Sequence, residues 1–367
     1  MTVEYCRGCG CVMQSTNPNK PGFIPESVRS KSQVCQRCYQ MTHYGKTGNI
    51  QLNPEQIENN IRKAVELSQL LVIVADFSDL TGTLPAWSEW ISDKPYLIVL
   101  NKLDLAPERT KHPEIIEYLQ EYLKDKFIKE PIKLILTSGL KGNGVAILLE
   151  EIKKATQPGA RIGLLGMTNV GKSSLIKKML AAEKSSQLPT VSKYPGTTLG
   201  LSNWSILKGR NTLIDTPGMA PGDRLGDLLC LECASELVST FKLGHKLWGF
   251  KPGKGMIVGK FFGIAQLGEK EAVLLSFISP ELPIHRTDNS KIGEFLTTGP
   301  SWMGKECKKC ASKLKWKEAI IRLTPNNDLA VAGLGWFSLR GTEAEFKIWY
   351  PEGIRWEIRP ALVGKKD

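Results

Sequence analysis

The sequence predicts a three-part chain whose central part is an α/β domain with a parallel sheet. Two observations predict this domain: strand-length apolar runs alternate with helical stretches, and the runs are apolar throughout, as in strands buried on both faces. The two ends lack this alternation. Residues 1–47 are rich in Cys, Gly and Pro, and residues 239–367 carry β-branched and aromatic runs. We therefore predict domains at residues 1–47, 48–238 and 239–367.

The composition is that of a folded, water-soluble protein. Of the 367 residues, 41% are hydrophobic and 23% are charged. No apolar run approaches the roughly 18 to 20 residues needed to cross a membrane, and the first residues show no secretory signal. We expect a cytoplasmic protein without membrane association, whose nine cysteines bind metal or stay reduced. The sequence sets no oligomeric state.

The charge of the chain indicates a polyanionic partner. Lys and Arg number 49 against 37 Asp and Glu, which gives a net charge of +12. Residues 46–235 are nearly balanced, with 23 basic and 21 acidic side chains, so the excess lies at the two ends. We expect the ends to hold a nucleic acid.

The first part carries two cysteine pairs. Cys6 and Cys9 form one C-x2-C pair, and Cys35 and Cys38 form another. Two such pairs are the usual layout of a four-thiolate zinc site, and a metal would stabilise a segment too small for a core of its own. We predict zinc here. Cys11 is then a spare thiol and His43 a substitute ligand.

The second part begins with a helix and continues as alternating strands and helices. Asn53 and Pro54 are typical of a helix start. Five strands are expected, at residues 70–76, 96–100, 133–137, 161–165 and 212–215. In the third part, strands are expected at residues 260–267, 271–279, 318–323, 329–339 and 345–350.

A phosphate-binding loop follows the strand 161–165. Residues 166–173 match G-x-x-x-x-G-K-[ST] and precede a helical stretch at residues 174–182. Backbone N–H groups of such a loop and the helix N-terminus bind phosphate oxygens. Lys172 would neutralise the β- and γ-phosphates, and Ser173 would bind Mg²⁺.

Two further segments complete a nucleotide switch. Asp215 ends a strand and can hold Mg²⁺, and Gly218 can contact the γ-phosphate through its N–H. Thr197 and Thr198 are candidates for the switch hydroxyl, of which we favour Thr198.

A guanine-binding motif follows the strand 96–100. In Asn101-Lys102-Leu103-Asp104, the Asp104 carboxylate can accept hydrogen bonds from guanine N1–H and N2–H, which adenine lacks as a pair. Ser138 and Gly139 follow the next strand and could present N–H groups to the base.

These motifs give one set of candidate site residues. The predicted nucleotide-binding residues are Asn101, Lys102, Asp104, Ser138, Gly139, Gly166, Thr168, Asn169, Val170, Gly171, Lys172, Ser173, Ser174, Thr197, Thr198, Asp215 and Gly218. The predicted catalytic residues are Lys172, Ser173, Thr198, Asp215 and Gly218, and the predicted Mg²⁺ ligands are Ser173, Thr198 and Asp215.

The order of the motifs differs from that of most GTPases, in which the phosphate loop comes first. Here the guanine motif precedes the phosphate loop, and Asp215 comes last. The chain therefore resembles a circularly permuted GTPase, which keeps the same site because domain termini commonly lie close together. The segment after Gly218 then leads directly into the third part, so that part could respond to the nucleotide state.

Met219 stands where many GTPases have the Gln that orients the attacking water. Family resemblance to GTPases with a hydrophobic residue here, together with Asn169, suggests that K⁺ or a partner supplies the missing charge. The alternative is that Asn169 is only a residue compatible with the loop.

Two more C-x2-C pairs occur later, at Cys230/Cys233 and Cys307/Cys310. The first pair lies in a helical pattern at residues 228–237, which would place both thiols on one helical face. The pairs are either buried free cysteines or together a second zinc site.

The C-terminal part also contains a basic, aromatic stretch. Its residues are Lys305, Lys308, Lys309, Lys313, Lys315, Lys317, Trp302 and Trp316. This combination suits phosphate attraction and base stacking, and the alternative is a solvated lysine loop whose tryptophans pack inward. The first part adds Arg7, Arg29, Lys31 and Arg37.

Over nearly its whole length the chain resembles the YqeH-type GTPases. The motifs that carry the resemblance are both N-terminal cysteine pairs, residues 101–104, 166–174, 195–198 and 215–218, His285-Arg286-Thr287 and Gly333-Leu334-Gly335-Trp336. The cysteine pairs at 230/233 and 307/310 are not part of that pattern. Members from organelles begin with transit peptides, and no such pattern is recognised in this sequence. We therefore expect a bacterial cytoplasmic protein or a trimmed form.

The resemblance implies a slow GTPase that converts GTP to GDP and phosphate with Mg²⁺ and acts in assembly of the small ribosomal subunit. Its nucleotide state would control binding to the subunit and its rRNA. Two alternatives are a GTPase acting on another RNA such as tRNA, and an RNA-binding scaffold that uses GTP as a structural ligand without turnover.

Overall fold

The computed structural model describes residues 4, 12–18, 22–29, 35–36, 53–91, 93–183, 200–299, 307, 310 and 314–364. The chain forms two compact units. The first consists of Met1–Asp76, Ala86–Leu103 and Phe127–Met219. The second consists of Phe77–Pro85, Asp104–Lys126 and Ala220–Asp367. Two segments that follow strands of the first unit thus belong to the second unit.

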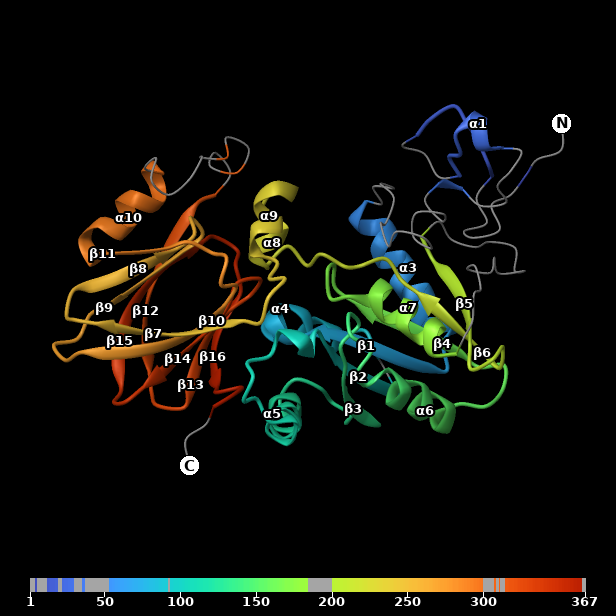
Figure 1. The fold of residues 1–367 in the computed structure, drawn as a ribbon, viewed down its shortest axis with the longest axis horizontal. Helices are drawn as coiled ribbons and strands as arrows, with labels where there is room; N and C mark the ends of the chain where they lie inside the picture. The colour runs from blue at the N-terminus through green and yellow to red at the C-terminus, as the bar shows by residue number, and fades with distance from the viewer. Residues whose placement is uncertain are drawn as a thin grey trace. The chain divides into compact units, whose positions relative to one another are not determined.

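The first unit contains a six-stranded sheet with helices around it (Figure 1). Its strands are β1 (Leu70–Asp76), β2 (Tyr96–Asn101), β3 (Lys133–Leu136), β4 (Arg161–Gly166), β5 (Ser202–Ile206) and β6 (Asn211–Asp215). Its described helices are α1 (Glu26–Arg29), α3 (Pro54–Leu67), α6 (Val145–Ala155) and α7 (Lys172–Ala182), with the 3-10 turns η2 (Pro85–Trp87) and η3 (Leu103–Leu105) at its borders with the second unit.

The strand order in this sheet is β3-β2-β1-β4-β6-β5. All neighbours are parallel except β5, which pairs antiparallel with β6 at the edge. Every residue of β1 and β2 is buried, which confirms the prediction of a parallel sheet covered on both faces. Strand β1 lies between β2 and β4 and is parallel to both, so the guanine motif after β2 and the phosphate loop after β4 reach the same edge of the sheet.

Helix α3 begins as the sequence predicts. Asn53 is its N-cap and accepts a hydrogen bond from the Gln56 N–H, while the Gln56 side chain accepts one from the Asn53 N–H. Pro54 occupies the first turn, where a missing N–H costs nothing. Strand β5 is not among the predicted strands. Its residues include two serines and alternate between buried and half-buried positions.

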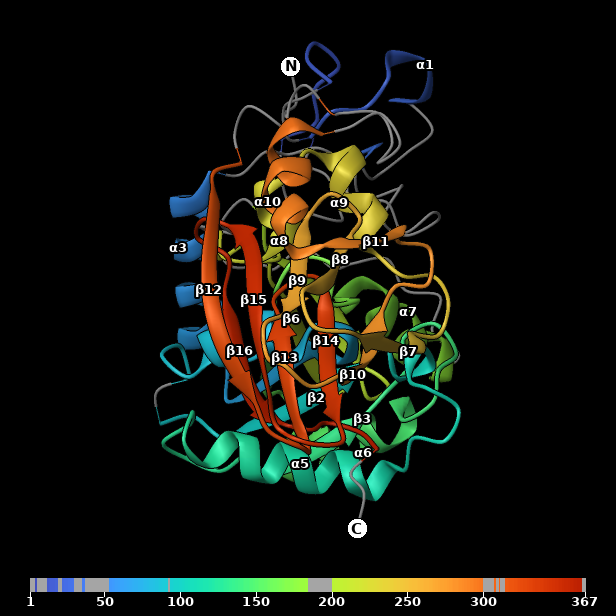
Figure 2. The same ribbon diagram turned by 90° about the vertical axis from the view of Figure 1, so that its left-hand side faces the viewer.

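The second unit is a sandwich of two antiparallel five-stranded sheets, as the β-rich third part predicts. Their orders are β16-β13-β14-β10-β7 and β11-β8-β9-β15-β12. The strands are β7 (Gly244–Phe250), β8 (Lys254–Val258), β9 (Phe262–Gln266), β10 (Ala272–Ile278), β11 (Ile284–Asp288), β12 (Trp316–Leu323), β13 (Asn327–Val331), β14 (Gly335–Arg340), β15 (Ala344–Pro351) and β16 (Trp356–Pro360). Figure 2 shows the long paired strands β12 and β15 side by side.

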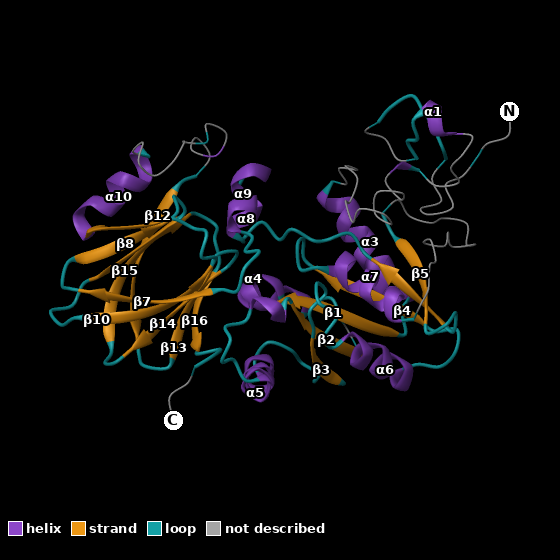
Figure 3. Ribbon diagram, in the orientation of Figure 1, coloured by secondary structure: helices purple, strands orange, loops and turns teal. Residues whose placement is uncertain are grey.

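Short helical segments complete the second unit (Figure 3). They are η1 (Phe77–Asp79), α4 (Leu80–Thr83), α5 (His112–Lys124), α8 (Leu225–Leu228), α9 (Leu231–Leu237) and α10 (Asn289–Thr298). The run of apolar residues predicts one strand at residues 329–339, whereas the structure contains the two strands β13 and β14 there. A turn closed by the Leu334 N–H and the Val331 carbonyl separates them, with Gly333 at a φ of +81°.

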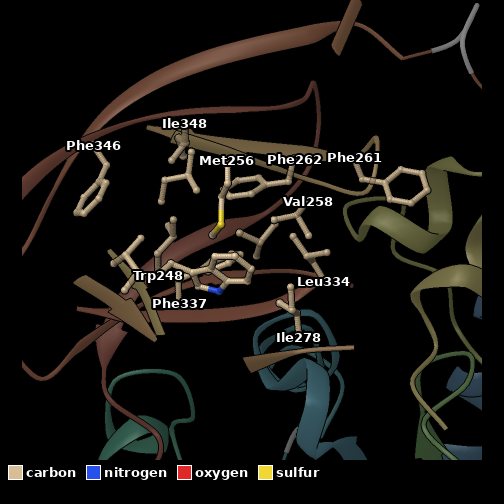
Figure 4. Close-up of a cluster of buried hydrophobic side chains, with 14 of the residues drawn as sticks. Trp248, Met256, Val258, Phe261, Phe262, Ile278, Leu334, Phe337, Phe346 and Ile348 are labelled. Carbon is tan, nitrogen blue, oxygen red and sulfur yellow. The ribbon is translucent and has the colours of Figure 1, made fainter. Parts of the chain in front are cut away.

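The core of the second unit lies between the two sheets (Figure 4). Phe262 of β9 and Phe337 of β14 stack at a centroid distance of 5.6 Å, and both are fully buried. Met256 and Trp248 come from the same two sheets and point into this core. Trp316 packs partly against a smaller cluster around Trp349, so for this tryptophan the structure favours the inward-packed alternative.

Among the described residues, no helix combines the length and the apolar character required to cross a membrane.

Candidate functional site

The phosphate loop connects β4 to α7 through residues with unusual backbone angles. Asn169 has a φ of +66° and Gly171 a φ of +92°, a region that glycine and, less readily, asparagine adopt. A Cβ atom at Gly171 would lie 2.4 Å from Nδ2 of Asn101, so only glycine fits there. The loop then leads into α7, which begins at Lys172, slightly before the predicted helical stretch at residues 174–182.

Lys172 is buried over this loop. Its Nζ donates hydrogen bonds to the carbonyl oxygens of Gly166 (2.7 Å) and Met167 (3.2 Å). An ammonium group held beside a helix N-terminus and a left-handed turn fits a phosphate chain, because charge and N–H donors converge. Ser173 and Ser174 follow in the first turn of α7. Their hydroxyls suit Mg²⁺ and phosphate.

Asn101 links three loops that are far apart in the sequence. Its Nδ2 donates to the carbonyl oxygen of Val170 in the phosphate loop (2.9 Å). Its Oδ1 accepts from the N–H of Gly139 (2.8 Å) and the hydroxyl of Thr137 (3.0 Å). The side chain is 1% exposed, so these bonds have little competition from water. Asn101 therefore positions the site, a task that the motif alone does not reveal.

Lys102 leaves β2 in a left-handed conformation, with a φ of +63°. Its Nζ forms an ion pair of 2.5 Å with Oδ2 of Asp76 at the end of β1. Asp76 is a site residue that our sequence analysis did not include. The feature that could have identified it is a carboxylate directly after a strand of apolar residues. Asp104 lies two residues after Lys102, half-buried in η3.

The predicted base-contacting loop after β3 is tightly folded. The Ser138 N–H donates to the Asn143 carbonyl (3.0 Å), and the Ser138 carbonyl accepts from the Gly142 N–H (2.6 Å). A Cβ atom at Gly139 would lie 3.3 Å from Cβ of Ser174, so the loop lies against the start of α7. The structure thus brings the Ser138 loop and the phosphate loop together.

The segment after β6 is also held against the phosphate loop. Asp215 ends β6 and is 7% exposed. The Thr168 N–H donates to the Met219 carbonyl (2.9 Å), and a Cβ atom at Gly218 would lie 2.9 Å from Cα of Thr168. Gly218 is therefore in direct contact with the loop that would hold phosphate. A carboxylate such as that of Asp215 is a ligand of the kind that Mg²⁺ prefers.

Several predicted residues lie outside the described residues. They are Thr197, Thr198, Cys6, Cys9, Cys11, Cys38, His43, Arg7, Lys31, Arg37, Trp302, Lys305, Lys308, Lys309 and Lys313. Cys35 is described and is 1% exposed.

The structure brings the other two cysteine pairs together in the second unit. The four sulfur atoms of Cys230, Cys233, Cys307 and Cys310 lie within 4.8 Å of one another. The prediction of one helical stretch at residues 228–237 is wrong in detail, because α8 ends at Leu228 and α9 begins at Leu231. Cys230 is the N-cap of α9 rather than a helical residue, so the pair does not share a helical face.

Comparison with known proteins gives two family matches. Residues 161–242 match the family described as 50S ribosome-binding GTPase, and residues 271–362 match the family described as YqeH-like, C-terminal. The first match contains the phosphate loop and Asp215, and the second covers most of the β-sandwich.

Three curated relatives illustrate the similarity. The uncharacterized protein YqeH of Bacillus subtilis (strain 168) is 24% identical over 375 residues, which cover 99% of this chain and 100% of that protein. The NO-associated protein 1, chloroplastic/mitochondrial, of Arabidopsis thaliana is 25% identical and covers 93% of this chain and 72% of that protein. Ribosome biogenesis GTPase A of Thermotoga maritima is 29% identical over 45% of this chain and 57% of that protein.

Proposed function

We propose that the chain is a circularly permuted GTPase of the YqeH type, because residues 161–242 and 271–362 match a GTPase family and the YqeH-like C-terminal family. It hydrolyses GTP, and its nucleotide state controls binding to the small ribosomal subunit and its rRNA. The observation that carries the proposal is the convergence of the permuted motifs. Asn101 ends β2, and its side chain is joined by hydrogen bonds to Gly139 and Val170 in two separate loops at one edge of a parallel sheet.

Each residue has a defined task in this proposal. Lys172 and the N–H groups at the start of α7 bind the phosphates, and Asp104 selects guanine. Ser173 and Asp215, together with Thr198, would hold Mg²⁺. The bound ion would neutralise charge on the phosphates. Gly218 lies against Thr168 in the phosphate loop, which supports the proposal that its N–H responds to the γ-phosphate.

The hydrolysis rate is proposed to be slow and raised by K⁺. Met219 has no group that can orient water, and its backbone carbonyl already accepts the Thr168 N–H. A cation or a partner must then supply the charge that other GTPases provide from side chains. The amide of Asn169 is the proposed ligand of that K⁺ ion.

A ribosomal partner is supported by the charge of the chain and by the names of its relatives. The net charge is +12, and described lysines such as Lys315 are exposed. One relative is named a ribosome biogenesis GTPase, and one matching family is described by binding to the 50S subunit. We propose the small subunit because the full-length resemblance is to YqeH-type proteins. We further propose a cytoplasmic location and zinc bound by the N-terminal cysteine pairs.

The direct test is co-sedimentation of the full chain with purified small and large ribosomal subunits. The chain is loaded with a non-hydrolysable GTP analogue or with GDP, in K⁺ buffer. We expect association with the small subunit alone, and the extent should differ between the two nucleotides. Association with the large subunit alone, or with neither subunit, would contradict the proposed partner.

Two variants test whether binding to the small subunit depends on the bound nucleotide. Lys172→Ala removes two charge-assisted contacts and should weaken GTP binding by at least about 100-fold. Lys177→Ala changes an exposed lysine of the same helix and should leave binding unchanged. If Lys172→Ala associates with the small subunit as the wild type does in both states, nucleotide control is wrong. GTP hydrolysis that stays negligible with subunits and K⁺ would favour the scaffold alternative.

A further inference from the structure

Four cysteines of the second unit converge although the chain between the two pairs is long. Cys230 and Cys233 stand at the start of α9, and Cys307 and Cys310 follow α10. Cys230 and Cys307 are 77 residues apart in sequence, and their sulfur atoms are 3.6 Å apart. All four sulfur atoms lie within 4.8 Å of one another. The fold therefore gathers two C-x2-C pairs into one cluster.

The separation of the sulfur atoms fits one tetrahedral metal ion. At a Zn–S distance of about 2.3 Å, the ligands of a tetrahedral site are about 3.8 Å apart. A disulfide needs about 2.05 Å between sulfur atoms, which is far shorter than the 3.6 Å between the sulfur atoms of Cys230 and Cys307. The cluster is also compact enough that a single ion, rather than a multinuclear iron–sulfur cluster, would fill it.

The local backbone supports thiolate ligands. The N–H of Cys230 donates to the sulfur of Cys310 at 3.2 Å, a bond that stabilises negative charge on sulfur. Turns fold each pair back on itself, because the Cys310 N–H donates to the Cys307 carbonyl (2.9 Å) and the Ala234 N–H donates to the Cys230 carbonyl (2.8 Å). Each pair thus presents two sulfur atoms to the same point.

The cluster lies at the border of the sandwich core. Cys233 and Cys310 are 2% and 5% exposed and belong to the buried cluster of the second unit. Cys230 and Cys307 are partly buried and pack against that cluster. Two buried and two partly exposed ligands leave a route for an ion to enter while the completed site is mostly shielded.

We propose that Cys230, Cys233, Cys307 and Cys310 bind one structural Zn²⁺ ion as four thiolates. Binding releases four thiol protons and leaves a complex with two negative charges, beside which Lys308 and Lys309 stand in the sequence. Four protein ligands leave no open position, which is typical of a structural site. The ion fastens the start of α9 to the segment after α10. The segment that follows Gly218 enters the second unit and continues to α9. The ion therefore fixes the end of this segment within the second unit.

The first test is peptide-mapped alkylation of the full wild-type chain, with and without a zinc chelator. Burial alone would protect Cys233 and Cys310, so the informative thiols are Cys230 and Cys307. We expect both to be protected in the native protein and to react after chelation. Reaction of both without chelator, or a disulfide between any two of the four cysteines, would overturn the proposal.

The second test measures metal content and separates this site from the predicted N-terminal one. Cys6→Ser/Cys9→Ser removes one of the two N-terminal cysteine pairs and so disrupts that four-thiolate site, and this variant should retain one zinc per chain. Adding Cys307→Ser/Cys310→Ser should remove it, whereas Cys11→Ser alone should lose none. Replacing zinc by Co²⁺ in the Cys6→Ser/Cys9→Ser protein should give the intense visible absorption of tetrahedral cobalt thiolate at one equivalent. Iron in place of zinc, or no such absorption, would overturn the assignment.

Discussion

The side chain of Asn101 makes three hydrogen bonds that join the guanine motif, the Ser138 loop and the phosphate loop. Asn101→Ala would leave buried groups of the Ser138 loop and the phosphate loop without this partner. We expect the free energy of unfolding to fall by about 3 kcal/mol. GTP affinity should fall at least about 10-fold, because the loops lose their alignment. Denaturant unfolding and equilibrium nucleotide binding measure the two effects.

Asn143→Ala is the matched control for Asn101→Ala. Asn143 lies in the same region and contributes a backbone carbonyl, which alanine keeps. The free energy of unfolding of Asn143→Ala should stay within about 0.5 kcal/mol of the wild-type value. A folded Asn101→Ala protein with wild-type GTP affinity would contradict the positioning role.

Asn169 can be tested separately as a backbone residue and as a K⁺ ligand. Its φ of +66° suits glycine, so Asn169→Gly keeps the loop and removes only the amide. We expect the wild type to hydrolyse GTP faster in K⁺ than in Na⁺ at matched ionic strength, and the variant to show about equal rates in both. Stimulation that persists in Asn169→Gly would show that Asn169 is only a compatible loop residue. Equal rates in the wild type would remove the K⁺ hypothesis itself.

We predict that the stability of the second unit depends on pH through the buried carboxyl group of Asp328. Burial raises the pKa of its carboxyl to about 6, although the Arg359 guanidinium (4.0 Å) and hydrogen bonds from Ser338 and Leu362 act in the opposite direction. The pKa in the unfolded chain is about 4. The contribution of this group to stability is therefore greatest below pH 4 and is lost as pH rises through about 6. The loss amounts to about 3 kcal/mol.

Urea unfolding between pH 4 and pH 7 checks this prediction. Asp328→Asn cannot titrate, so the wild type should lose stability relative to the variant over this range. If the two unfolding free energies change in parallel with pH, the prediction fails.

At the scale of elements, the contact between the phosphate loop and the segment after β6 is made by backbone. A Cβ atom at Gly218 would lie 2.9 Å from Cα and 3.0 Å from N of Thr168. Gly218→Ala must therefore move one segment away from the other, and GTP affinity should fall about 10-fold. Gly226→Ala is the control, because no heavy atom lies within 4 Å of its Cβ position. Equal affinities of the two variants would contradict a role for this contact.

The elements that the sequence predicts well are those with strong local patterns. Strand β1 has the predicted bounds, and α3 has the predicted N-cap, because a run of apolar residues and an Asn-Pro pair each determine local structure. Strands β13 and β14 were merged, since a turn through Gly333 lies within one apolar run. The edge strand β5 is not among the predicted strands, and neither are β7, β8, β11 and β16 of the sandwich.

The candidate site was predictable where a short motif carries the chemistry, as at Lys172. It was not predictable where contacts join distant segments. The hydrogen bonds of Asn101 and the ion pair of Asp76 depend on the strand order, which no local pattern contains. The same holds for the four cysteines of the second unit, whose spacing left two interpretations open and whose convergence is a property of the fold.

At the scale of the whole molecule, the permuted order links the nucleotide site to the C-terminal part of the chain. Asp215 ends the last strand of the first unit, and the chain enters the second unit at Ala220. Segments after β1 and β2 also belong to the second unit by their contacts. The chain therefore leaves the edge of the sheet that carries the motifs and enters the second unit at three places. In the proposed function, these connections would transmit the nucleotide state to the second unit.

The central claim is that the permuted motifs form one guanine-nucleotide site, and the base specificity of Asp104→Asn tests it most directly. The wild-type carboxylate accepts from guanine N1–H and N2–H, whereas an asparagine amide can donate to the C2 carbonyl of xanthine. We predict that Asp104→Asn loses at least about 100-fold in GTP affinity and gains binding of XTP. Asp93→Asn, which changes an exposed carboxylate, should keep the wild-type preference. An Asp104→Asn protein that still selects GTP over XTP would contradict the account.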